Sequence, residues 1–209
     1  MYKAIVWDLD GTLLNTTEGV KIAVKNTITE LGLEPLDEMI LDKFVGPPMQ
    51  LSFQQYYLMD EKNALFAANR FRAHYKNESL FIAELYPETL TVLKKLSQKG
   101  YHMAVATNKS HENAMAILEH FGVAKYCDFA MGSDLEGKLK KADIIKKCLE
   151  VLYVNPNEAI YIGDSIFDLE GAQKMGMDFI GVTYGFGFHR GESIGYRLVN
   201  SMHEIGEIF

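Results

Sequence analysis

The alternation of short apolar runs with helical stretches is the feature that most constrains this fold. In residues 142–152, Ile144, Ile145, Cys148, Leu149 and Leu152 form one apolar stripe, with charged residues on the opposite face. Nearly continuous apolar strands separated by such helices indicate a parallel sheet that is covered on both faces. The sequence therefore predicts an α/β fold with a doubly wound (Rossmann-like) sheet. The five predicted strands are residues 4–7, 102–106, 127–131, 159–162 and 179–182.

One region, residues 15–85, interrupts this alternation and contains no convincing strand. It is typical of several helices separated by glycine, proline and aspartate, and the predicted helices are residues 17–31, 36–44, 51–57 and 61–77. We therefore expect a core domain of residues 1–14 and 86–209 and an inserted all-helical cap domain of residues 15–85. Such a cap could cover a site at the end of the first strand and exclude water. The alternative is a helical decoration that adds only stability.

The composition and net charge of the chain bear on its partners and on its location. The 209 residues carry a formal net charge of −7, and the isoelectric point is near 5.4. This charge argues against nucleic acid or an anionic membrane as the main partner. Cys127 and Cys148 form no metal-binding pattern, and we expect both to be reduced. We find no signal peptide and no apolar segment long enough to span a membrane, so a cytoplasmic protein is expected. We further expect a monomer or a homodimer.

The run Asp8-Leu9-Asp10-Gly11-Thr12 follows directly on the first predicted strand. Open α/β sheets bind their ligands at this carboxyl edge. Two carboxylates so close together are costly unless a cation or a proton offsets their charge. A site that binds a metal is therefore favoured over two acids that merely cap the next helix.

Other polar residues follow the remaining strands and should meet at the same edge. Thr107-Asn108-Lys109 follows the second strand, a basic cluster at 138–141 follows the third, and Gly163-Asp164-Ser165-Ile166-Phe167-Asp168 follows the fourth. The carboxylates could hold magnesium, while a hydroxyl, an amide and a lysine could hold phosphate oxygens. One carboxylate could attack phosphorus and a second could transfer protons. The inventory therefore suits phosphoryl transfer.

These motifs resemble those of the haloacid dehalogenase superfamily, in the branch with a helical cap after the first strand. The resemblance covers nearly the whole chain, and the motif Asp-x-Asp-Gly-Thr is its most specific part. Within the superfamily the chain is most similar to phosphoglycolate-phosphatase-like proteins. The segments that carry this similarity are Leu85-Tyr86-Pro87-Glu88, Val105-Ala106-Thr107-Asn108-Lys109 and Gly181-Val182-Thr183-Tyr184-Gly185.

The resemblance implies a role for each motif residue. Asp8 would be the nucleophile that becomes phosphorylated, and Asp10 the general acid and base. Asp8, the backbone carbonyl of Asp10 and Asp164 would bind Mg²⁺, and Asp168 would act at the metal through water or by orienting its neighbours. Gly11, Thr107 and Asn108 would bind the phosphate.

The basic cluster offers Lys138, Lys140 and Lys141 as the lysine that offsets charge at the phosphate. The family often has proline after this lysine, and here no proline follows any of the three. Similar proteins have the pattern Lys-x-(Asp/Glu)-x-Ile, which favours Lys141 because Asp143 and Ile145 follow it. Lys141 would also open a helix whose amino terminus favours anions.

The resemblance implies a magnesium-dependent phosphatase that hydrolyses a small phosphorylated metabolite through an aspartyl-phosphate. Phosphoglycolate, a nucleoside monophosphate and a sugar phosphate are the candidate substrates. The alternative is a phosphotransferase similar to β-phosphoglucomutase, which would keep Asp8 and Asp10 but return the phosphoryl group to a sugar. A binding module without turnover is disfavoured, because Asp8, Asp10 and Asp164 are all present.

Overall fold

The computed structural model describes residues 2–134 and 139–209. The chain forms two compact units, one made of Met1–Asn15 with Leu85–Phe209 and the other made of Thr16–Glu84. Within the described residues no helix is long and apolar enough to cross a membrane.

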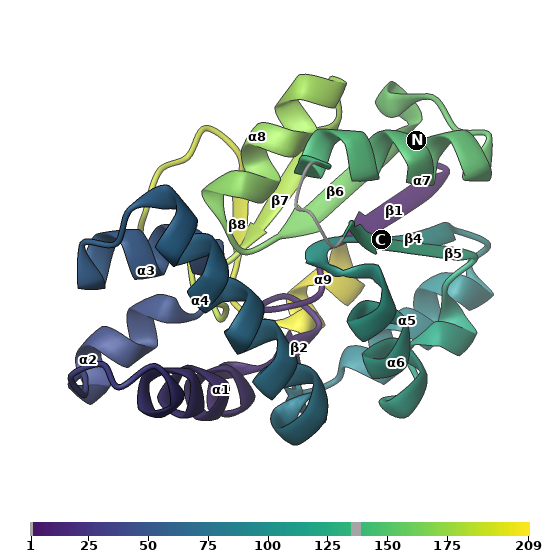
Figure 1. The fold of residues 1–209 in the computed structure, drawn as a ribbon. Helices are drawn as coiled ribbons and strands as arrows, with labels where there is room; N and C mark the ends of the chain where they lie inside the picture. The colour runs from purple at the N-terminus through teal and green to yellow at the C-terminus, as the bar shows by residue number, and fades with distance from the viewer. Residues whose placement is uncertain (1, 135–138) are drawn as a thin grey trace. The chain divides into compact units, whose positions relative to one another are not determined.

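A six-stranded sheet with the order β5-β4-β1-β6-β7-β8 forms the centre of the first unit (Figure 1). Every adjacent pair of its strands is parallel. This confirms the predicted α/β fold with a doubly wound parallel sheet and a helical insertion between β1 and β4. The strands are β1 (Ala4–Trp7), β4 (His102–Ser110), β5 (Phe129–Ser133), β6 (Ala159–Gly163), β7 (Asp178–Val182) and β8 (Arg197–Val199).

Helices cover both faces of this sheet, which explains why its central strands are apolar. Helices α7 (Lys141–Leu152) and α8 (Ile166–Met175) lie on one face, and α5 (Thr89–Gln98), α6 (His111–His120) and α9 (Met202–Ile208) lie on the other (Figure 1). All four residues of β1 are fully buried between these layers. The predicted stripe of α7 packs into the core, where Ile144, Ile145 and Cys148 are fully buried. Single 3₁₀ turns occupy Ala124–Tyr126 and Pro156–Glu158.

The order in which successive strands are added to the sheet reverses between β1 and β6. The connection after β1 leads to β4 on one side, whereas the connection after β6 leads to β7 on the other. Parallel sheets open a crevice outside the carboxyl ends of the strands at such a point. Asp8 and Asp164 are the first residues after β1 and β6, so both stand at this crevice.

The second unit is helical. It contains α1 (Thr17–Glu30), α2 (Glu38–Leu41), a 3₁₀ turn (Asp42–Phe44), α3 (Met49–Tyr57), α4 (Glu61–His74) and a π-helical turn (Tyr75–Ser79). Phe44 and Phe53 pack edge to face with their ring centroids 5.4 Å apart, and both are fully buried. Gly19 of α1 lets the backbone approach closely, since a Cβ there would lie 2.6 Å from the carbonyl oxygen of Ser79. The Ser79 hydroxyl donates to the carbonyl of Gly19 at 2.7 Å and fixes that contact.

Some predicted bounds were wrong. The strand expected at 127–131 begins at Phe129, because Cys127 ends a 3₁₀ turn and the Asp128 carboxylate accepts a hydrogen bond from the backbone of Met103. The strand expected at 102–106 runs on to Ser110. Three short strands were not predicted at all: β8, and the two-residue strands β2 (Leu14–Asn15) and β3 (Glu84–Leu85), which pair with each other.

Candidate active site

Three buried carboxylates meet at the crevice between β1 and β6. Asp8 follows β1, Asp164 follows β6, and Asp168 lies in the first turn of α8. One oxygen of each lies within 4.8 Å of the others, and the three residues are 6%, 3% and 1% exposed. The structure thus brings together three of the four aspartates that the sequence suggested as metal ligands.

Lys141 reaches into this cluster from the start of α7. Its side-chain nitrogen lies 2.6 Å from Oδ1 of Asp8 and 2.8 Å from Oδ1 of Asp168. It also donates to the carbonyl oxygen of Ala106 at 3.2 Å. Lys140 is exposed, and Lys138 lies outside the described residues. Of the candidate lysines that are described, Lys141 is therefore the one placed against Asp8.

A glycine in α8 makes room for the Lys141 side chain. A Cβ at Gly171 would lie 2.6 Å from Cγ of Lys141 and 3.1 Å from Cδ1 of Ile145. Any larger residue would therefore displace the lysine stem. Helices α7 and α8 pack closely at this point, and the lysine passes between them to the sheet edge.

Asp164 is held by the loop that follows β7. The backbone N–H groups of Phe186 and Gly187 donate to Oδ2 of Asp164 at 2.7 and 3.3 Å. Gly11 has a φ of +83°, and a Cβ there would lie 2.6 Å from Cγ of Asp164. A Cβ at Gly185 would overlap the carbonyl oxygen of Gly11 and lie 2.6 Å from Oδ2 of Asp164. Glycine is therefore required at both positions for the backbone to close around this carboxylate.

Both oxygens of Asp168 have partners, which come from Ser165, Lys141 and Tyr161. Its Oδ2 accepts hydrogen bonds from the backbone N–H and the hydroxyl of Ser165, at 3.1 and 2.6 Å, in a capping box at the start of α8. Its Oδ1 faces Lys141. Helix capping thus fixes the carboxylate that in turn fixes the lysine.

The predicted phosphate-binding residues Thr107 and Asn108 lie near the end of β4. Thr107 is 2% exposed, and its Oγ1 accepts a hydrogen bond from the backbone N–H of Lys109 at 3.2 Å. Asn108 is exposed. Asp10 is not a member of the buried carboxylate group, and its Oδ1 pairs with Nζ of Lys109 at 2.9 Å.

The sequence analysis did not predict a role for two residues near the site, Tyr161 and Lys109. Tyr161 of β6 is fully buried, and its hydroxyl donates to the carbonyl of Ala106 at 2.6 Å while it accepts from Nζ of Lys141 at 3.2 Å. It was assigned only to an apolar strand, although a buried tyrosine hydroxyl needs a polar partner. Lys109 was quoted as part of a motif without any role.

Burial and mutual repulsion raise the pKa values of Asp8 and Asp164. Desolvation, with the charge of Asp168, raises the pKa of Asp8 to about 7, although Lys141 opposes this rise. Desolvation and the charges of Asp168 and Asp8 raise the pKa of Asp164 well above its ordinary value. Burial alone would lower the pKa of Lys141, but the charges of Asp168 and Asp8 outweigh burial and raise it.

These charges fit a divalent cation. Three carboxylates face one ammonium group, so the cluster carries two uncompensated negative charges when all three acids are ionised. Every candidate ligand is an oxygen, which suits a hard cation. The donor set is therefore consistent with a metal site.

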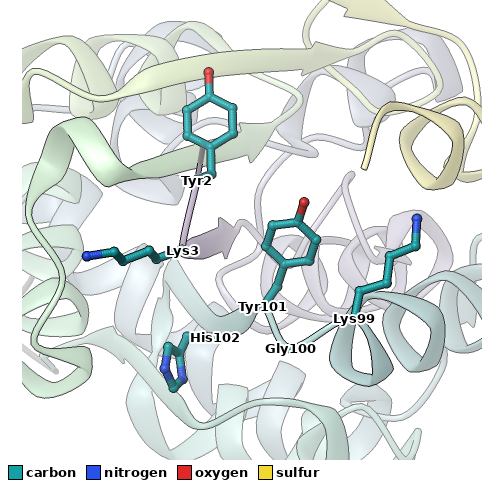
Figure 2. Close-up of a pocket in the computed structure, with 6 residues that line it drawn as sticks. All are labelled: Tyr2, Lys3, Lys99, Gly100, Tyr101 and His102. Atoms are coloured by element: carbon teal, nitrogen blue, oxygen red, sulfur yellow. The ribbon is translucent and has the colours of Figure 1, made fainter.

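A pocket lies at the opposite edge of the sheet, before β1 and β4 (Figure 2). Lys3 and Lys99 point away from each other there. Lys3 pairs with Glu158 at 2.5 Å, and Lys99 donates to the carbonyl of Phe209 at 2.7 Å. The two lysines of this pocket do not converge on one point, so the buried carboxylate cluster is the better candidate for the functional site. The pocket is lined by Tyr2, Lys3, Lys99, Gly100, Tyr101 and His102.

Fold and site together define a doubly wound α/β protein with an acidic site at the switch point of its parallel sheet. A sequence model for haloacid dehalogenase-like hydrolases matches residues 5–182, and the chain belongs to that family.

Known proteins of this kind resemble the chain over most of its length. A 5'-nucleotidase of Pseudomonas aeruginosa is 33% identical over 187 residues, which cover 89% of this chain and 85% of that protein. A phosphoglycolate phosphatase of Rhodospirillum rubrum is 32% identical, with 89% and 81% covered. The crystal structure of a "predicted phosphatase" from Clostridium acetobutylicum has a TM-score of 0.92 and 38% identity, with 100% and 98% covered.

Proposed function

We propose that this protein is a magnesium-dependent phosphatase that hydrolyses a small phosphate monoester through an aspartyl-phosphate on Asp8. The observation that carries the proposal is the position of Asp8, at the end of β1 with Lys141 at 2.6 Å and two further buried carboxylates beside it. The similarity to a 5'-nucleotidase and to phosphoglycolate phosphatases supports phosphoglycolate and nucleoside monophosphates as the first candidates. A sugar phosphate is the third.

In the first step an oxygen of the Asp8 carboxylate attacks phosphorus, and the bond from phosphorus to the ester oxygen breaks. Asp10 donates a proton to the departing oxygen, so an alcohol leaves. In the second step the Asp10 carboxylate takes a proton from water, and the water oxygen attacks phosphorus. Inorganic phosphate then leaves, and the Asp8 carboxylate is restored.

Other residues of the chain bind and orient the phosphoryl group. Lys141 offsets negative charge beside Asp8, while Thr107, Asn108 and the backbone at Gly11 donate hydrogen bonds to phosphate oxygens. Asp8, Asp164, Asp168 and the carbonyl of Asp10 would hold the metal. When bound there, magnesium would supply positive charge that offsets the repulsion between Asp8 and the phosphate.

The domain division belongs to this proposal. Residues 1–14 and 86–209 form the core domain that carries the chemistry, and residues 15–85 form a cap domain that supplies contacts to the substrate. The compact helical unit Thr16–Glu84 supports this division.

The test is phosphate release from a panel of esters with and without Mg²⁺, for the wild type, Asp8→Asn and Asp10→Asn. A substrate turned over with kcat/KM above about 10⁴ M⁻¹s⁻¹ and a silent Asp8→Asn variant would support the proposal. Activity that survives in Asp8→Asn would contradict the mechanism. Transfer of the phosphoryl group to a sugar after charging with a sugar bisphosphate, in place of phosphate release, would favour the phosphotransferase.

A further inference from the structure

Lys109 forms an ion pair with Asp10 that is separate from the carboxylate cluster. Its Nζ lies 2.9 Å from Oδ1 of Asp10, and the two side chains are 9% and 23% exposed. The two aspartates of the Asp8-Leu9-Asp10 motif thus have different lysines. Lys141 is paired with Asp8 in the interior, whereas Lys109 is paired with Asp10 where the carboxyl group still reaches solvent.

The position of Lys109 depends on a local irregularity of β4. The register between β4 and β5 shifts between Ala106 and Ser110, so the pairing of the two strands is irregular at this point. Irregularities of this kind, such as bulges, re-aim side chains next to active sites. The backbone N–H of Lys109 donates to Oγ1 of Thr107, so the same residue that holds Asp10 also orients the Thr107 hydroxyl.

The pair occupies only one of the two oxygens of the Asp10 carboxyl. Lys109 bonds to Oδ1. Among residues 2–134 and 139–209, no hydrogen-bond partner is found for Oδ2. A carboxyl group that is held by one oxygen keeps its rotamer and presents the other oxygen.

We propose that Lys109 is a positioning residue for proton transfer: it holds Oδ1 of Asp10 and leaves Oδ2 to give the proton to the departing ester oxygen and to take it from water. This inference rests on the proposed function, because it assigns a partner to the proton-transferring Asp10. It implies that the loss of Lys109 slows the steps in which Asp10 gives or takes a proton.

The test compares two leaving groups in single-turnover measurements of enzyme phosphorylation. An alkyl ester such as phosphoglycolate needs a proton on its leaving oxygen, whereas 4-nitrophenyl phosphate releases a stable phenolate without one. In Lys109→Met, phosphorylation by the alkyl ester is expected to slow by about 10²-fold, the lower end of general acid catalysis. The burst of nitrophenolate should change by less than about 3-fold, because that step needs no acid.

Matched variants separate positioning from other roles. Lys109→Arg should restore most of the alkyl-ester rate, and Lys146→Met on the exposed face of α7 should match the wild type. The double variant Lys109→Met, Asp10→Asn should be no slower than Asp10→Asn alone, since both changes remove the same proton transfer. Equal slowing with both leaving groups, or a rise of KM for both, would make Lys109 a phosphate-binding residue and overturn the proposal.

A second measurement does not depend on turnover. In crystal structures of the wild type and Lys109→Met, the Asp10 carboxyl should keep one rotamer in the first and lose it in the second. An unchanged Asp10 rotamer in the variant would overturn the positioning role. If the wild type released no phosphate from any ester, the proposed function would be wrong, and the crystal structures alone would decide whether Lys109 positions Asp10.

Discussion

The side-chain nitrogen of Lys141 lies 2.6 Å from Oδ1 of Asp8, and both side chains are less than a tenth exposed. The two residues are 133 positions apart in sequence, and they meet because β1 ends and α7 begins at the same edge of the sheet. Their contact therefore links the stability of the fold to the charge of the site.

Lys141→Met should abolish phosphatase activity and also destabilise the protein. It leaves Asp8 and Asp168 buried without a cation, and breaking a buried pair on one side costs about 3–5 kcal/mol. Urea unfolding in the presence of a chelator measures this change in the free energy of unfolding. Lys147→Met, on the exposed face of the same helix, is the control and should unfold like the wild type. Equal midpoints for the two variants would contradict this prediction.

Tyr161→Phe should lower the free energy of unfolding by about 1–2 kcal/mol, because it removes a buried hydroxyl that bonds to the Ala106 carbonyl. The Lys141 ammonium keeps its bond to that carbonyl, which limits the cost. The matched control is Tyr153→Phe, since Tyr153 is 95% exposed. The expected order of urea midpoints is wild type and Tyr153→Phe together, with Tyr161→Phe below them.

Gly185→Ala should weaken metal binding strongly, since the new methyl group would collide with the carbonyl of Gly11 and with Asp164. Isothermal titration with Mg²⁺ would measure the affinity directly. Gly206→Ala is a fair comparison, because a Cβ there meets only Val92 and the end of Lys95, at 3.3 Å or more. Wild-type affinity in Gly185→Ala would show that the loop after β7 does not constrain Asp164.

His74 should make the stability of the helical unit depend on pH. Its ring lies 2.8 Å from Glu78 and 2.7 Å from Glu30, and these partners raise the pKa of His74. A raised pKa gives stabilisation that is complete below the ordinary histidine pKa and is lost as the pH rises through the folded-state value. The Tm difference between wild type and His74→Gln should therefore be larger at about pH 5.5 than at about pH 8.5. His189→Gln, at an exposed position, should show no such trend; a difference for His74→Gln that grows with pH would refute the sign.

The sheet could be predicted because its strands are buried on both faces and therefore apolar throughout. β8 could not, because an edge strand of three residues that begins with Arg197 carries no such signal. The predicted start of β5 was too early because apolar Cys127 was included, although Asp128 separates it from the strand that begins at Phe129. The two-residue strands β2 and β3 depend on their pairing with each other rather than on composition.

The position of the candidate site was predictable for a related reason. Motif residues that follow directly on apolar strands must lie at the carboxyl edge, and Asp8 and Asp164 do. The contacts of Lys109 and Tyr161 were not predictable. The contact of Lys109 depends on a register shift between β4 and β5. The contact of Tyr161 depends on which face of β6 meets Lys141 of α7.

The glycine at position 171 makes α7 and α8 a single functional part. Glycine in a helix interior is less favourable than alanine by about 1 kcal/mol, so Gly171 lowers the intrinsic helix stability of α8. The space left by Gly171 allows the Lys141 side chain of α7 to pass α8 and reach Asp8 at the sheet edge. Neither helix can then be redesigned or grafted alone. Lys141 beside a larger residue at position 171 would clash, and Gly171 without Lys141 would leave a void behind Asp8.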